Sequence, residues 1–192
     1  MAQWSLPIEC ETLRFEELFA SIDSVILDIG FGGGEGLIDM AAARPYEAII
    51  GLDVHTPGVA SVVEAIDDNS WQHVRVAEGD VLELLPRIPH GSLAGVRLYF
   101  PDPWPKQKQR HRRLARPDVV TQLVDRLRIG GTLHVATDIA DYAAQTLSVC
   151  EGEQRLAGGR VARPDWRPET RFERRGLAAG RDPIDMIFER TH

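Results

Sequence analysis

Three glycines at alternate positions, Gly30, Gly32 and Gly34, follow a short apolar run and precede Glu35. Glycine lets a backbone turn tightly and approach a ligand with no Cβ in the way. The spacing is GxGxG, and Glu35 stands where a dinucleotide-binding fingerprint has its third glycine. A glutamate opening a helix disfavours a pyrophosphate there, whereas a sulfonium amino acid carries no phosphate. The loop therefore favours S-adenosylmethionine (SAM) over NAD.

Aspartates end five successive apolar runs: Asp28, Asp53, Asp80, Asp102 and Asp138. Any single one could be an ordinary turn former or helix cap, but a series of five indicates a site. Asp53 is placed to accept hydrogen bonds from both ribose hydroxyls, Asp80 from the exocyclic amine of an adenine, and Asp28 from the amino group of a methionine. With the glycine loop, these acids predict a Rossmann-like methyltransferase.

The segment from Phe100 to Pro105 alternates its three prolines with Asp102 and Trp104. Proline fixes its own φ and disfavours the helical region for the residue before it. We therefore expect a stiff, extended segment that holds Asp102 and Trp104 at the mouth of the site. The alternative is a rigid cap whose Trp104 packs into the core, and an indole could both support the loop and present a face to a base.

Charge is segregated along the chain, whose net charge is −7. Six lysines and arginines and no acid lie between Lys106 and Arg116, a stretch that we call the basic segment. The rest of the chain contains the other 16 lysines and arginines and all 29 acids, so its net charge is −13. The basic segment could bind phosphates, with Arg112 and Arg113 as candidate RNA contacts, or it could be a solvated surface only.

Short apolar runs alternate with amphipathic stretches along the chain. Val- and Ile-rich runs predict strands at 24–30, 48–54, 73–80, 94–100 and 131–138, and helical periodicity covers 35–43, 58–67, 117–128 and 140–150. This alternation predicts an α/β fold with a doubly wound, mostly parallel sheet. Residues 183–190 predict a final strand, and the little helix pattern before it makes an antiparallel orientation plausible. Ligands of such sheets bind beyond the carboxyl ends of the strands.

Length and composition bound the class of protein. A chain of 192 residues predicts one domain, 1–192, with a short N-terminal extension at 1–22. Its 43% hydrophobic and 27% charged residues are typical of globular proteins, and no run is apolar enough to cross a membrane. The N-terminus has no signal-peptide pattern, so we expect a cytoplasmic protein. Cys10, Cys150 and the histidines lack metal-ligand spacing, and either a monomer or a homodimer is compatible with the sequence.

Motifs along most of the chain resemble those of the bacterial tRNA (guanine-N7-)-methyltransferases. In chain order they are LDIGFGGGEG, GLDVHTPGV, FPDPWPK, the Arg112-Arg113 pair, ATDIADYA, RPETRFERRG and DMIFER. The resemblance implies a SAM site formed by Asp28, Asp53, Asp80 and Asp102, with Asp102 catalytic. It also implies tRNA as the partner and substrate contacts from Lys106, Asp138, Thr170, Arg171, Phe172 and Glu173.

Guanine N7 has a lone pair and no proton, so methyl transfer to it needs no general base. A carboxylate near the purine, from Asp102 or Asp138, could stabilise the positive charge that develops and orient the ring. Glu173 could accept two N–H bonds from the Watson–Crick edge while nearby arginines hold phosphates, or this stretch could be an exposed salt-bridged loop. The leading hypothesis is methyl transfer to guanine N7 in tRNA. The alternatives are another RNA or a small molecule as acceptor, and a non-catalytic RNA-binding module.

Overall fold

A computed structural model describes residues 4–6, 10–19 and 24–192. Seven strands form one sheet in the order β3-β2-β1-β4-β5-β7-β6. Their bounds are β1 (Val25–Ile29), β2 (Ala48–Asp53), β3 (Val74–Glu78), β4 (Leu93–Tyr99), β5 (Leu127–Thr137), β6 (Leu156–Val161) and β7 (Ile184–Arg190). The first five are parallel and β7 is antiparallel to β5, which confirms the predicted fold class and the orientation of the last strand.

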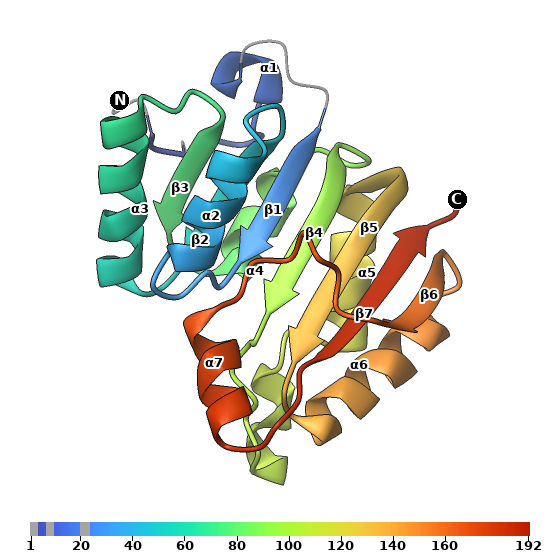
Figure 1. The fold of residues 1–192 in the computed structure, drawn as a ribbon. Coiled ribbons are helices and arrows are strands. Elements are labelled where there is room, and N and C mark those ends of the chain that lie inside the picture. The colour runs from blue at the N-terminus through green and yellow to red at the C-terminus, as the bar shows by residue number, and fades with distance from the viewer. Residues whose placement is uncertain (1–3, 7–9, 20–23) are drawn as a thin grey trace.

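Helices cover the sheet on both faces, as Figure 1 shows. Their bounds are α1 (Phe15–Leu18), α2 (Glu35–Ala43), α3 (Thr56–Asn69), α4 (Val81–Leu84), α5 (Pro117–Arg126), α6 (Ala140–Gly152) and α7 (Arg171–Ala178), with 3₁₀ turns η1 (Leu85–Arg87) and η2 (Gln107–Arg112). Helices α2 and α3 pack on one face, and α4, α5 and α6 pack on the other. Crossovers on both faces bury the central strands β1 and β2 completely, so these strands are apolar except for Asp28 and Asp53 near their carboxyl ends.

The N-terminal extension lies partly outside the described residues. Its described part packs against the sheet, since Ser5 bridges Val76 of β3 and the side chains of Leu6, Leu13 and Phe19 are buried. These side chains belong to the same apolar cluster as α4, α5 and α6. The extension is therefore part of the core along its described length.

Two differences from the sequence-based expectation have a clear structural reason. The helix expected to reach residue 128 ends at Arg126, because Leu127 is already extended and opens the 11-residue strand β5. Strand β6 was not expected, because its two adjacent glycines, Gly158 and Gly159, weaken the strand pattern. Gly158 faces the backbone of β7 so closely that a Cβ there would lie 2.1 Å from the carbonyl oxygen of Ile187. The pairing with β7 therefore needs a glycine at this point.

Candidate active site

The glycine loop lies at the carboxyl end of β1 and turns through three left-handed residues. Gly30, Gly32 and Gly34 have φ of 73°, 63° and 89°, values that strain any residue with a Cβ. The loop is pressed against the start of α3, since a Cβ on Gly58 would lie 1.7 Å from the carbonyl oxygen of Gly32. Gly34 caps α2, and Glu35 is the first residue of that helix. The backbone can thus approach a ligand closely along this loop.

The carboxylate of Asp53 joins the end of β2 to the glycine loop. Its Oδ2 accepts a hydrogen bond from the Gly32 amide at 2.5 Å, and its Oδ1 accepts one from the His55 amide at 2.8 Å. Each carboxylate oxygen has a second lone pair, so Asp53 keeps the capacity to accept two further hydrogen bonds. The arrangement fits the predicted role on a ribose diol, with the carboxylate orientation already set by the backbone.

Asp28 lies inside β1 and is 3% exposed. No donor among the described residues hydrogen-bonds to its side chain, and the facing cation is Arg97, its neighbour in register on β4. Burial raises the pKa of the Asp28 carboxyl to about 7, although Arg97 opposes the shift. A buried carboxylate without a donor is a fitting partner for a cationic ligand group, such as an ammonium or a sulfonium.

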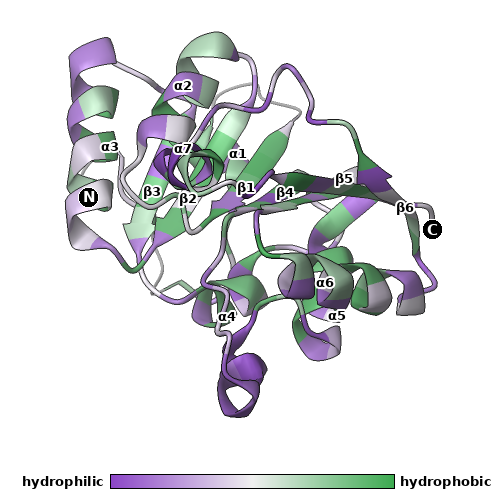
Figure 2. Cartoon of the chain, turned by 60° about the horizontal axis from the view of Figure 1, so that its bottom comes forward, coloured by the Kyte–Doolittle hydropathy of each residue, from purple (hydrophilic) through white to green (hydrophobic). Residues whose placement is uncertain are grey.

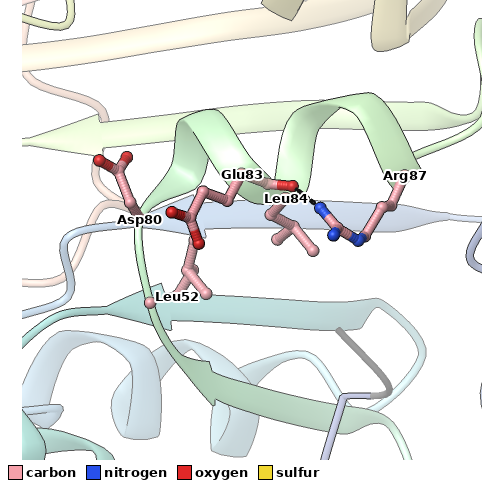
Figure 3. Close-up of a pocket in the computed structure, with 6 residues that line it drawn as sticks. Leu52, Asp80, Glu83, Leu84 and Arg87 are labelled. Carbon is pink, nitrogen blue, oxygen red and sulfur yellow. Dashed lines mark hydrogen bonds between the residues drawn. The ribbon is translucent and has the colours of Figure 1, made fainter. Parts of the chain in front are cut away.

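Asp80 caps the short helix α4, since its Oδ1 accepts a hydrogen bond from the Leu82 amide at 2.9 Å. Figure 3 shows it beside a cavity of about 40 Å³, lined by Leu52, Gly79, Asp80, Glu83, Leu84 and Arg87. A cavity of that size has room for a few waters and not for a purine, because one water needs about 10–15 Å³ of such space. A base near Asp80 would therefore lie outside this cavity. Val54, directly after Asp53, is an apolar side chain that is 72% exposed.

The expectation of an extended proline segment is wrong at both of its ends. Phe100 and Trp104 each precede a proline, and yet their φ values are 50° and 39°. Left-handed backbone at bulky residues stores strain and persists only where the surroundings impose it. The segment therefore bends before Pro101 and again before Pro105. The bends leave Asp102 exposed at the carboxyl edge of β4 and Trp104 half-buried.

Arg113 holds the second of these bends, at Trp104, and this buried position corrects its predicted role as an RNA contact. Its side chain is fully buried. Its Nε donates to the carbonyl oxygen of Pro103 at 2.8 Å, and its Nη atoms donate to Gln145 Oε1 and Asp141 Oδ2 at 2.8 and 2.7 Å. A further contact reaches the carbonyl oxygen of Trp104. Prolines have no backbone N–H, so the loop offers few donors of its own, and the Arg113 guanidinium donates to its carbonyl oxygens instead. Arg113 is therefore a brace for the loop and not part of the basic surface.

We expect Arg113→Met to destabilise the protein by about 2–3 kcal/mol, because several buried charged hydrogen bonds are lost together. Release of the loop should also lower any activity that depends on Asp102. Arg112→Met is the matched control. Arg112 is the exposed neighbour of Arg113, and its replacement should change stability by less than about 0.5 kcal/mol. Chemical denaturation of both variants measures the difference, and equal stabilities would contradict the brace.

The rest of the basic segment projects from the body of the protein. Turn η2 and its flanks form the strongly hydrophilic projection at the bottom of Figure 2. Arg110 pairs with Asp141 and Arg116 with Asp118, whereas Lys106, Lys108 and Arg112 are exposed with no acidic partner among the described residues. The Arg112 guanidinium stacks 4.8 Å from the centre of the Trp104 ring. The exposed cations thus begin directly beside the proline segment.

Helix α7 lies across the carboxyl edge of the sheet, near the ends of β1 and β4 (Figure 1). No helix was expected here, although Thr170 and Glu173 have the spacing of a helix-capping box. Thr170 Oγ1 accepts a hydrogen bond from the Glu173 amide at 3.1 Å. The exposed Arg171 opens the helix, and the ring of Phe172 lies over Gly32. Of the four predicted substrate contacts on this segment, Arg171 and Phe172 are therefore exposed, and Thr170 is half-buried with its hydroxyl capping the helix.

Glu173 is the exception, and its predicted contact with the guanine edge is wrong in this conformation. It is 2% exposed, and both of its carboxylate oxygens accept hydrogen bonds at 2.7 Å from Arg167. Arg163 also donates to Oε1 at 2.8 Å. A carboxylate enclosed by two guanidinium groups has no free edge for a base, so Glu173 holds α7 in place.

Asp138 follows β5 and contacts the other end of α7. Its Oδ2 accepts a hydrogen bond from Arg181 Nε at 2.7 Å. It also lies so close to Gly176 that a Cβ there would be 2.6 Å away, which explains a glycine inside a helix. The sequence reasoning missed both Gly176 and Arg181. Asp138, Asp102 and the glycine loop are thus gathered around one edge.

Two findings concern other kinds of site. Within residues 4–6, 10–19 and 24–192, no group of three or more His, Cys, Asp or Glu side chains could hold a metal ion. In the same ranges no helix is long and apolar enough to span a membrane.

Comparison with known proteins gives a family and a set of close relatives. Residues 23–186 match the model of the family Methyltransf_4, described as "Putative methyltransferase". A protein of Bordetella pertussis named tRNA (guanine-N(7)-)-methyltransferase is 42% identical over all of this chain and 77% of its own length. Proteins of the same name from Thiobacillus denitrificans and Chromobacterium violaceum are 42% and 39% identical, over 96% and 99% of this chain and 83% and 86% of their own lengths.

Solved structures resemble the fold at low sequence identity. A 16S rRNA (adenine(1408)-N(1))-methyltransferase from Catenulisporales acidiphilia with the cosubstrate SAM has a TM-score of 0.66 at 14% identity, over 93% of this chain and 90% of that chain. An rRNA methylase from Streptococcus thermophilus has a TM-score of 0.60 at 15% identity, over 92% and 91% of the two chains. These likenesses concern the arrangement of strands and helices.

Proposed function

Because this chain belongs to the bacterial tRNA (guanine-N7-)-methyltransferase family, we propose that it transfers a methyl group from SAM to N7 of a guanine in tRNA. The relatives cover the chain from end to end. The single observation that carries the proposal is the meeting of the glycine loop, Asp53 and Asp102 at one edge of the sheet, with exposed cations beside it. An RNA acceptor and a cytoplasmic location follow from the same proposal.

The residues at this edge fit SAM. Asp28 offers a buried carboxylate to the cationic methionine end, and Asp53 offers a pre-oriented carboxylate to the ribose. Val54, directly after Asp53, presents an exposed apolar side chain for the adenine ring. When bound, SAM supplies a methyl group on a positively charged sulfur. At the end of the glycine loop, Glu35 opens α2 and pairs with Arg174 of α7 at 3.4 Å. A carboxylate at this position disfavours a phosphate group, and SAM carries none.

Orientation and charge are what the protein must supply, because N7 needs no proton removed. Asp102 is exposed beside the loop and would stabilise the positive charge that develops on the purine. Asp138 keeps Oδ1 available while Arg181 holds Oδ2, so it can accept an N–H bond from the Watson–Crick edge. The brace from Arg113 keeps Asp102 aligned, and alignment matters since methyl transfer requires an in-line approach.

The direct test is incubation of the purified protein with unmodified bulk tRNA and SAM labelled in its methyl group, followed by nucleoside analysis. We expect label in 7-methylguanosine. Label in another nucleoside would change the acceptor, and an absence of SAM binding in calorimetry would exclude both enzyme hypotheses.

The exposed cations of the basic segment should set the affinity for tRNA. We expect Lys108→Ala with Arg112→Ala to weaken tRNA binding and to lower the slope of log K against log salt by about 1–2, because each phosphate contact releases counterions. Filter binding at several salt concentrations measures the slope. Arg116→Ala, whose guanidinium pairs with Asp118, is the control. An unchanged slope in the double variant would mean that these cations are only a solvated surface.

A further inference from the structure

Within the part of the chain that the structure describes, no helix covers β4, β5 and β7 on one face of the sheet. Residues 162–170, which we call the strap, cross it instead and lead into α7, as Figure 1 shows. The side chains of Arg97, Tyr99, His134 and Asp185 are buried on these strands, outside the apolar cluster of the opposite face. Strands β4, β5 and β7 therefore alternate: their polar side chains lie on the face under the strap, and their apolar side chains lie on the face covered by helices.

Arg167 of the strap is the centre of the buried polar contacts. Its side chain is fully buried. Its Nη atoms donate to both oxygens of Glu173 at 2.7 Å, and its Nε lies 2.7 Å from Oδ1 of Asp185. The guanidinium also stacks 5.5 Å from the centre of the Phe100 ring, at the left-handed residue that opens the proline segment. One side chain therefore contacts β7, α7 and the start of the Asp102 loop.

The contacts continue from Asp185 into the centre of the sheet. His134 Nε2 lies 2.7 Å from Asp185 Oδ1, and His134 Nδ1 lies 2.9 Å from the hydroxyl of Tyr99. Burial lowers the pKa of His134. A neutral ring with its proton on Nε2 donates to Asp185 and accepts from Tyr99, so each group has a partner. Tyr99 and His134 thus hold Asp185 in place, and Asp185 in turn orients Arg167.

A buried ion-pair network of this kind adds little stability, because the loss of hydration offsets the attraction between the charges. What it does supply is geometry, because a guanidinium binds a carboxylate through two parallel bonds in one plane. We propose that Arg167 is a positioning residue: it sets α7 relative to Phe100, and so keeps Phe172 over Gly32 and Gly176 against Asp138. This inference rests on the proposed methyl transfer for its kinetic consequence.

The test compares Arg167→Lys with Arg163→Lys. Lysine keeps the charge and cannot bind both carboxylates through a planar fork. The matched residue Arg163 contacts the same Glu173 from the solvent side, with a side chain 35% exposed. In Arg167→Lys we expect amide hydrogen exchange in α7 to rise about tenfold or more, with the exchange of β1 and β4 unchanged. We expect kcat for tRNA methylation to fall by about tenfold or more, since small misplacements of reacting groups are costly.

Asp185→Asn, which removes the opposite charge at almost constant volume, should show the same pattern, and Arg163→Lys should show neither change. Unchanged exchange in α7 would overturn the proposal, and so would faster exchange with a wild-type kcat. If the wild-type protein forms no 7-methylguanosine, the proposed function fails, and the exchange measurement still decides whether Arg167 sets the position of α7.

Discussion

Asp102→Ala should lower the rate of methyl transfer by about 10²–10³-fold while the protein remains folded. Removal of one group that stabilises charge in a transition state typically has an effect of this size. Stability should change little, because Asp102 is exposed and its side chain makes no hydrogen bond or ion pair within the described residues. Asp102 was expected to lie at this edge from the sequence, and the structure adds that Arg113 holds the loop that carries it.

Single-turnover kinetics with labelled SAM measures this effect. Asp68→Ala on the outer side of α3 removes an equally exposed carboxylate and should leave the rate unchanged. Thermal unfolding of both variants separates chemistry from folding. A rate within a few-fold of the wild type in Asp102→Ala would remove this residue from the mechanism and leave Asp138 as the carboxylate next to the purine.

Asp28→Asn should stabilise the protein and weaken SAM binding at the same time. Burial raises the folded-state pKa of Asp28 to about 7, above the ordinary value of 3.8 for an aspartate. The folded protein therefore binds more protons than the unfolded chain between these values, and stability falls as pH rises from about 4 to 7. The full cost of the buried charge above pH 7 is of the order of 4 kcal/mol, at about 1.4 kcal/mol per pKa unit. An amide at this position avoids that cost.

The same substitution removes the negative charge that we assign to the methionine end of SAM. Calorimetry should show weaker SAM binding to Asp28→Asn at pH 8. In the wild type, affinity should fall by up to tenfold per pH unit below about pH 7, as the carboxyl becomes protonated. Denaturant unfolding from pH 4 to 8 should show a flatter pH dependence in the variant. A variant that is less stable at pH 8, or that binds SAM as the wild type does, would contradict this account.

These two residues show what sequence reasoning could and could not reach. Asp28 and Asp102 were found because acids at the ends of parallel strands must meet at one edge of the sheet. The raised pKa of Asp28 could not be predicted, since it depends on which neighbours on β4 and α2 exclude water from it. Likewise, the prolines beside Asp102 indicated a constrained loop, but its bends at Phe100 and Trp104 were not expected, and the guanidinium groups that contact these two residues belong to Arg167 and Arg113.

The sequence-based predictions failed most clearly for charged side chains. Arg112 and Arg113 are adjacent in the basic segment and were expected to act alike. The structure exposes Arg112 and buries Arg113 against Asp141 and Gln145 of α6. Glu173 was expected to bind a base, and Arg167 of the strap encloses it. A charge run predicts net charge, but burial depends on which carbonyls and carboxylates the fold brings within hydrogen-bond distance.

The sequence by itself determined the alternation of strands and helices, the glycine loop and the acids at the strand ends, because these follow from local periodicity and from the conformational freedom of glycine. Only the tertiary structure decided which charged residues serve the site and which ones build it. Arg113 and Arg167 are buried where they meet carboxylates far along the chain, those of Asp141 and Asp185, because a buried cation needs such partners. Such partners are set by contacts between distant segments, and no local pattern in the sequence encodes them.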